Sequence, residues 1–177
     1  MNICIFCGSS IGLDQVYVEA AKETARAMIS IDASLVYGGG NIGLMGIVAD
    51  EFIKAERKVI GVIPDFLLQR ELGHQEITEL LVVKSMHDRK KRMADLSDGF
   101  IALPGGWGTL EELAEILTWR QLGLIDKPIG ILNCNGFFDP LVTQMTRMVQ
   151  DGFLQKDVFE SLKIEKYPKE LLANMGF

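Results

Sequence analysis

The chain has 177 residues, 48% of them hydrophobic and 24% charged, which is typical of a globular protein with a substantial core and excludes a disordered segment. Its formal net charge of −6 argues against a surface that coats nucleic acid. The longest charge-free stretch, residues 33–49, is shorter than the roughly 20 apolar residues of a membrane span, and the N-terminus lacks the basic segment of a secretion signal. Three cysteines are too few for a disulfide framework, so we expect a cytoplasmic protein with one domain, residues 1–177, and neither nucleic acid nor membrane as partner.

Short apolar runs alternate with longer amphipathic stretches along the whole chain. The apolar runs predict strands at Asn2–Phe6, Ser34–Tyr37, Lys58–Ile63, Leu80–Lys84, Gly99–Leu103, Pro128–Leu132 and, more briefly, Leu162–Ile164. The intervening stretches predict helices at Gln15–Ser30, Leu44–Ala55, Met86–Leu96, Thr109–Leu122, Phe138–Gln150 and from Pro168 onward. Apolar strands that alternate with helices indicate an α/β fold, a Rossmann-like, doubly wound parallel sheet in a single domain.

Glycine-rich loops follow two of the predicted strands, and eight of the 18 glycines lie in them. One loop, residues 37–46, contains Gly38, Gly39, Gly40, Gly43 and Gly46, and the other runs from Pro104 to Thr109 as Pro-Gly-Gly-Trp-Gly-Thr. A glycine-rich turn that leads into a helix exposes unpaired N–H groups and the positive end of the helix dipole, which is how proteins bind phosphate. We therefore expect a phosphate on the N–H groups of Gly105 to Thr109, helped by Gly39, Gly40 and Ser9. Either loop alone also admits a purely structural interpretation, because tight turns use glycine without a ligand.

Two familiar nucleotide motifs are missing. The turn after the first strand reads Gly8-Ser9-Ser10-Ile11-Gly12, which is not the Gly-x-Gly-x-x-Gly of dinucleotide-binding proteins. No Gly-Lys-Ser/Thr occurs, so a P-loop is excluded as well. The phosphate-bearing ligand is therefore expected to be neither NAD nor a P-loop nucleotide.

Arg89 is singled out by its position on a predicted helix. At 100° per residue, it falls within the apolar stripe set by Met86, Met93 and Leu96. An arginine on a core-facing stripe needs a partner or a polar pocket. The alternative is that its stem covers apolar surface while its head reaches water.

Glu112 is singled out by the same test on the helix after the second glycine loop. It lies between Ile116 and Trp119 in angle, on the edge of the buried face, whereas Glu111 and Glu115 lie on the outer side. The residues Thr109 to Glu112 also match a capping box, which would explain the glutamate without any ligand. If Glu112 and Arg89 instead meet at the phosphate pocket, they suit glycosidic cleavage, whose transition state resembles an oxocarbenium ion.

Metal and cofactor chemistry receives little support from the sequence. Cys4 and Cys7 have ligand-like spacing, but on a strand their side chains point to opposite faces, and no second pair completes a zinc site. His74 and His87 have no ligand-like neighbours in sequence, and His87 is a candidate for lining the pocket. We therefore expect no bound metal and no cofactor.

Several motifs together resemble the Lonely Guy (LOG) family, whose members often carry the label "possible lysine decarboxylase". The residues from Pro104 to Glu112 are similar to the PGGxGTxxE signature of that family. The resemblance extends over nearly the whole chain through these segments: Cys7–Ser10, Tyr37–Gly40, Gly43–Gly46, Met86–Lys90, Trp119, Gln121–Gly123 and Lys127–Pro128. It implies a phosphoribohydrolase that converts cytokinin riboside 5′-monophosphates, or AMP, to free base and ribose 5-phosphate.

The resemblance also implies roles for individual residues. The catalytic pair would be Arg89 and Glu112. Substrate-binding residues would be Glu71, Arg89, Lys90, Gly106, Trp107, Gly108, Thr109, Leu110, Glu111, Glu112 and Thr118. The residues after Glu71, Leu-Gly-His-Gln, depart from the Leu-Thr-Gly-Glu of plant members, so base selectivity is expected to differ. Short members of the family are homodimers with pockets near the interface, so a homodimer is expected.

The sequence is also compatible with two other functions. A nucleotide-binding module could sense or carry the same ligand without hydrolysing it. A salvage enzyme with another base preference would use the same site, because apolar contacts to a base discriminate by only a few kcal/mol. A true decarboxylase is disfavoured, since no lysine is placed to hold pyridoxal phosphate as a Schiff base.

Overall fold

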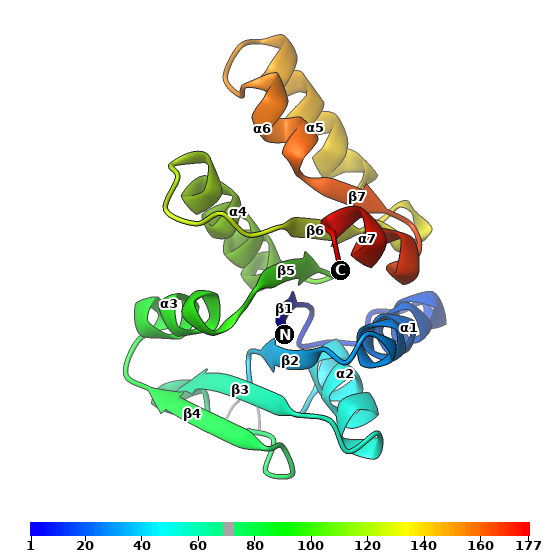
Figure 1. Ribbon diagram of the computed structural model, residues 1–177, viewed down its shortest axis with the longest axis vertical. Helices are drawn as coiled ribbons and strands as arrows, with labels where there is room; N and C mark the ends of the chain where they lie inside the picture. The colour runs from blue at the N-terminus through cyan, green and yellow to red at the C-terminus, as the bar shows by residue number, and fades with distance from the viewer. Residues whose placement is uncertain (69–72) are drawn as a thin grey trace.

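The computed structural model describes residues 1–68 and 73–177. In this part of the chain seven strands form one parallel sheet in the order β4-β3-β2-β1-β5-β6-β7 (Figure 1). The strands are β1 (Asn2–Phe6), β2 (Ser34–Tyr37), β3 (Val59–Pro64), β4 (Glu79–Val83), β5 (Gly99–Ala102), β6 (Ile129–Leu132) and β7 (Lys163–Glu165). The helices are α1 (Gln15–Ser30), α2 (Gly43–Lys54), α3 (Met86–Leu96), α4 (Trp107–Gln121), α5 (Asp139–Gln150), α6 (Lys156–Ser161) and α7 (Pro168–Met175). The predicted doubly wound α/β fold is confirmed.

The predicted elements agree with the structure to within two residues at their ends. One helix, α6, was not predicted, because its six residues are too short to show a periodic pattern. Two single-turn 3₁₀ helices, Asp65–Leu67 and Cys134–Gly136, were also missed. None of these elements alters the sheet.

Helices cover both faces of the sheet and create two separate cores. Helices α1, α2 and α7 lie on one face, and α3, α4 and α5 lie on the other (Figure 1). Strand side chains alternate between the two cores, so that Cys7 belongs to the α1–α2 core and Cys4 to the α3–α4 core. The prediction that these two cysteines point to opposite faces is confirmed.

The sheet has a switch point where its strand order reverses. The chain builds outward from β1 through β2 and β3 to β4, and then returns to place β5 on the other side of β1. In open α/β sheets, ligands bind beyond the carboxyl ends of the strands at such a switch point. The loops after β1 and β5 are therefore the natural place for a site.

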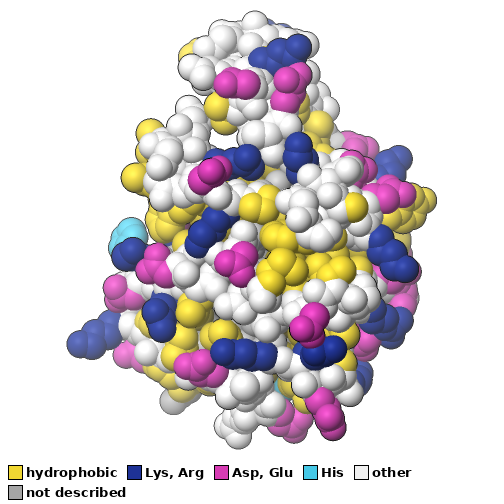
Figure 2. Space-filling view, in the orientation of Figure 1, with side chains coloured by type: hydrophobic (Ala, Val, Ile, Leu, Met, Phe, Trp, Pro, Cys, Tyr) yellow, Lys and Arg dark blue, Asp and Glu magenta, His cyan; other side chains and the backbone are white. Residues whose placement is uncertain are grey.

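Two surface properties bear on partners. In the face shown in Figure 2, acidic and basic side chains are interspersed, and no continuous basic patch gathers. None of the described helices combines the length and hydrophobicity that a membrane crossing requires.

Candidate active site

Three turns meet at the switch point of the sheet. The N–H of Gly8, after β1, donates to the carbonyl of Pro104, after β5, at 3.1 Å, and the N–H of Leu44, at the start of α2, donates to the carbonyl of Gly8 at 3.0 Å. The packing is tight: a Cβ on Gly43 would lie 2.2 Å from the carbonyl carbon of Ser9, and one on Gly105 would lie 2.8 Å from the nitrogen of Gly8. The structure thus places Gly8 against Gly105, and Ser9 against Gly43, at one junction.

Helix α4 begins at this junction with an open N-terminus. Its N-cap is Gly106, and no side chain of the described residues caps it. Gly106, Trp107 and Gly108 are exposed, and a Cβ on either glycine would meet nothing within 4 Å. The first N–H groups of the helix, and the positive end of its dipole, therefore face open space that an anion could occupy.

The capping-box interpretation of Glu112 is wrong. The helix begins at Trp107, so Thr109 lies inside its first turn and is not the N-cap. The side chain of Thr109 is buried and packs under Gly105 instead, because its Oγ1 would lie 2.1 Å from a Cβ at that glycine. A capping role therefore does not account for Glu112.

Arg89 is held inside the molecule by backbone carbonyls. Its side chain projects from α3, and the residue is 5% exposed. Its Nε donates to the carbonyl of Val62 within β3, and its Nη2 to the carbonyl of Gly38 after β2, each at 3.1 Å. The inward orientation is confirmed, and the alternative in which the head reaches water is wrong.

Glu112 on α4 and Arg89 on α3 both influence the pKa of the buried Cys4 thiol. Burial raises the pKa of the Cys4 thiol well above its ordinary value; the Glu112 carboxylate raises it further, and the Arg89 guanidinium lowers it. Burial and the Glu112 carboxylate also raise the pKa of Cys7. Both charges therefore influence Cys4 in the middle of β1, Arg89 from α3 and Glu112 from α4. A hollow of about 10 Å³ on the α3–α4 face is lined by Phe6, Lys90, Ala94, Glu112, Glu115, Ile116 and Trp119.

Lys90 joins α3 to α4 through two ion pairs. Its ammonium contacts the carboxylate of Glu111 and lies 3.0 Å from that of Glu115. Burial alone would lower the pKa of Lys90, but the two carboxylates outweigh it and raise the pKa above its usual value. Two of the predicted substrate-binding residues, Lys90 and Glu111, are thus paired with each other.

The remaining predicted residues are spread over several places. Gly39 and Gly40 are buried, and Gly39 has a φ of +79°, which favours glycine. Thr118 donates its hydroxyl to the carbonyl of Ala114 at 2.7 Å and lines a groove of about 360 Å³ between α4, α5 and α6, away from the turns. Glu71 lies outside the described residues. His87 is exposed.

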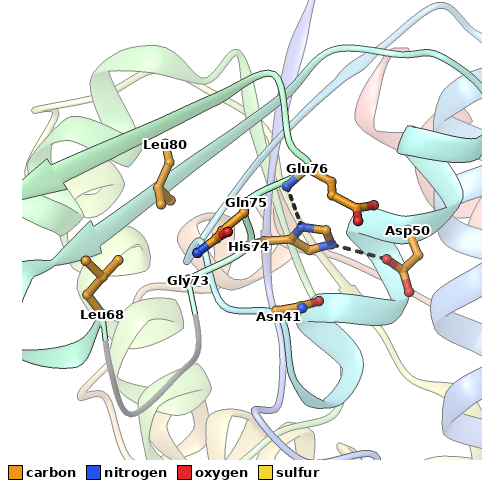
Figure 3. Close-up of a pocket in the computed structure, with 8 residues that line it drawn as sticks. All are labelled: Asn41, Asp50, Leu68, Gly73, His74, Gln75, Glu76 and Leu80. Carbon is orange, nitrogen blue, oxygen red and sulfur yellow. Dashed lines mark hydrogen bonds and ion pairs between the residues drawn. The ribbon is translucent and has the colours of Figure 1, made fainter.

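Sequence reasoning missed a cavity of about 710 Å³ on the α2 side of the Gly38–Gly40 turn (Figure 3). Its described lining consists of Asn41, Asp50, Leu68, Gly73, His74, Gln75, Glu76 and Leu80. His74 is 3% exposed, and its Nε2 lies 3.2 Å from Oδ1 of Asp50. No sequence pattern relates these two residues, which belong to different elements. Within the described part of the chain, no three His, Cys, Asp or Glu side chains are grouped to hold a metal ion.

Comparison with known proteins places the chain in a family. The family model described as "Possible lysine decarboxylase" matches residues 45–175. A cytokinin riboside 5′-monophosphate phosphoribohydrolase of Oryza sativa subsp. japonica is 47% identical over 174 residues, with 98% of this chain and 72% of the relative covered. The chain belongs to the LOG family. An Arabidopsis thaliana LOG-family enzyme of the same name is 45% identical, with 98% of this chain and 81% of the relative covered.

The LOG-family fold is shared with proteins of distant sequence. The molybdenum cofactor binding protein of Rippkaea orientalis superposes with a TM-score of 0.72 at 20% identity, with 99% of this chain and 97% of the other covered. The molybdenum cofactor carrier protein of Chlamydomonas reinhardtii gives 0.70 at 18% identity, with 97% and 98% covered. At these identities the likeness concerns the fold alone.

Proposed function

We propose that the protein hydrolyses the N-glycosidic bond of nucleoside 5′-monophosphates, taking cytokinin riboside 5′-monophosphates and AMP and releasing free base and ribose 5-phosphate. The observation that carries this proposal is the open N-terminus of α4 at the switch point of the sheet, with Glu112 on the same helix and the buried Arg89 on neighbouring α3. The names of the relatives that are 45% and 47% identical support the same reaction.

The phosphate belongs at the N-terminus of α4. The N–H groups of Trp107, Gly108 and Thr109 are the first of that helix, and the space over Gly106 and Gly108 is open. Backbone donors and the helix dipole supply a positive potential at this point even though the whole chain is negative. This arrangement fixes the 5′ end of the substrate and leaves its ribose to extend along α4 toward Glu112.

Arg89 and Glu112 address the bond that breaks. When the bond between C1′ of the ribose and the base nitrogen cleaves, its electron pair leaves with the base and positive charge develops on the ribose. The Glu112 carboxylate stabilises that charge and accepts a proton from the attacking water, which bonds to C1′. The Arg89 guanidinium orients the nucleotide and stabilises the negative charge on the departing base, which then takes up a proton from water to become the free base.

Hydrolysis is tested by incubating the purified protein with AMP and with isopentenyladenosine 5′-monophosphate and following base release by chromatography. Glu112→Gln should lower kcat by roughly 10²- to 10⁴-fold, the usual contribution of a general base, and leave AMP affinity largely unchanged. Glu23→Gln, which changes an exposed glutamate of α1 in the same way, serves as a control. Base release from neither substrate would favour the alternative of a nucleotide-binding module that does not turn its ligand over.

Lysine decarboxylation is not the chemistry that these residues support. A lysine that carries pyridoxal phosphate must react as a neutral amine. Lys90, the lysine nearest the site, has the opposite environment, since Glu111 and Glu115 raise its pKa and keep it protonated.

The groove between α4, α5 and α6 supports a homodimer. Most of its lining is apolar and includes Leu110, Leu117 and Met148, alongside the predicted binding residue Thr118. A second copy seated there would bury this surface and bring its own α4 close to the first. Leu117→Asp should convert a dimer to a monomer in sedimentation equilibrium, whereas a wild-type protein that is monomeric at micromolar concentration would contradict the proposal.

Three buried free thiols, Cys4, Cys7 and Cys134, are consistent with the proposed cytoplasmic location.

A further inference from the structure

The turn after β2 connects the two faces of the sheet. The carbonyl of Gly38 accepts the Nη2 of Arg89 at 3.1 Å, on the side of α3. The next carbonyl, that of Gly39, accepts the backbone N–H of His74 at 2.9 Å, on the side of α2. Gly40 then pairs with Gly73 in an antiparallel bridge. Successive residues of one glycine turn are thus anchored to opposite faces of the sheet.

Both ring nitrogens of His74 have partners, Asp50 on helix α2 and Glu76 in the segment before β4. Nδ1 accepts the N–H of Glu76 at 3.3 Å, and therefore Nε2 is assigned the proton that it donates to Asp50 at 3.2 Å. Figure 3 shows the ring between these two partners, with Asp50 projecting from α2. The ring is buried, and the Asp50 side chain that accepts from it is half exposed.

We propose that His74, held by Asp50, is a positioning residue for Arg89. It fixes the Gly38–Gly40 turn, and through the Gly38 carbonyl it fixes the guanidinium on the other face. The inference concerns the placement of Arg89; its consequence for catalysis rests on the proposed function.

The chemistry of the turn explains why it needs an anchor. Glycine has the least restricted backbone of any residue, so three in succession hold no preferred conformation by themselves. A side chain at position 38 would displace the Arg89 guanidinium, because its Cβ would lie 2.1 Å from the Arg89 Nη2. The conformation therefore has to be set by outside partners, and His74 supplies one on the α2 side.

The first experiment compares His74→Ala and His74→Gln by steady-state kinetics with AMP. His74→Ala should lower kcat by roughly 10- to 100-fold, as expected when a catalytic group is displaced by about 1 Å, with KM changed less than about threefold. His74→Gln keeps a donor for Asp50 and should recover most of kcat. Asp50→Ala should act in the same direction as His74→Ala, and Glu76→Ala, in the same cavity wall, should have no effect.

The second experiment does not depend on catalysis. The Arg89 Nε–H, bonded to the Val62 carbonyl, should give a protected ¹⁵N signal, assigned by its loss in Arg89→Lys. His74→Ala should speed its hydrogen exchange at least tenfold, while Glu76→Ala should leave it unchanged.

The outcomes separate this inference from the proposed function. Unchanged Arg89 exchange in folded His74→Ala and Asp50→Ala overturns the inference, as does a lower melting temperature with wild-type kcat. If the wild-type protein hydrolyses no nucleotide, the proposed function fails, and the exchange measurement still decides whether His74 positions Arg89.

Discussion

Two glycine-rich turns lie at the same end of the sheet and use glycine for opposite reasons. In the turn after β2, Gly38 and Gly39 are buried, and a Cβ on either would touch neighbouring atoms within 3.4 Å. In the turn after β5, Gly106 and Gly108 are exposed, and a Cβ would meet nothing within 4 Å. The first turn lacks side chains because protein fills the space, whereas in the second turn the space is filled at Gly105 and open at Gly106 and Gly108.

The difference shows that a glycine-rich loop is not by itself a phosphate site. The buried turn presents carbonyls to Arg89 and to the backbone of His74, and so it serves to orient protein groups. The exposed turn presents N–H groups at the start of α4, which is the polarity that an anion requires. Substituting alanine in each turn gives a direct test of this division.

The largest effect is expected from Gly38→Ala. Its methyl group would displace the Arg89 guanidinium, so kcat for AMP should fall by about 100-fold. Because the clashing atom is the end of a flexible side chain, the free energy of unfolding should fall by only about 1–3 kcal/mol. Kinetics and urea denaturation measure the two effects. Wild-type activity in the folded variant would show that the Gly38 contact does not position Arg89.

The second largest effect is expected from Gly108→Ala, which should stabilise the fold, unlike Gly38→Ala, and weaken AMP binding. Alanine should raise the free energy of unfolding by about 0.5–1 kcal/mol, because glycine is a poor helix residue and the added methyl meets no neighbour. The same methyl stands beside the proposed phosphate, so AMP should bind about tenfold more weakly, a loss of about 1.4 kcal/mol. Emission of Trp107, which is 88% exposed, can report binding. Unchanged affinity would place the phosphate elsewhere.

The smallest effect is expected from Glu115→Gln, which weakens the link between α3 and α4 beside the exposed turn. The folded-state pKa of Lys90 is raised, so its ion pairs contribute stability below the unfolded pKa of about 10.4 and lose it as pH rises through the folded value. At pH 8 the variant should lose about 0.5–1 kcal/mol in urea denaturation. The difference from wild type should shrink above pH 10.4, and a difference that persists there would assign the loss to packing.

Much of the architecture could be predicted from local patterns. The period of the apolar residues located β1, β2, α1 and α3 at their observed bounds, because a strand or helix buried on the expected face must repeat at 2 or 3.6 residues. The same periodicity placed Arg89 inside the molecule, where it is 5% exposed. It failed for the start of α4, since Gly106 caps that helix without any side-chain signal.

The sequence by itself determined the alternation of strands and helices, the family, and the inward orientation of Arg89. Each of these depends on the spacing of residues within one element or on a continuous motif. Only the tertiary structure decided what Arg89 contacts and which glycine turn is open. It also brought Asp50 and His74 together across 24 residues. These properties depend on which elements become neighbours in the sheet, and side chains from separate elements carry no common period that a sequence could reveal.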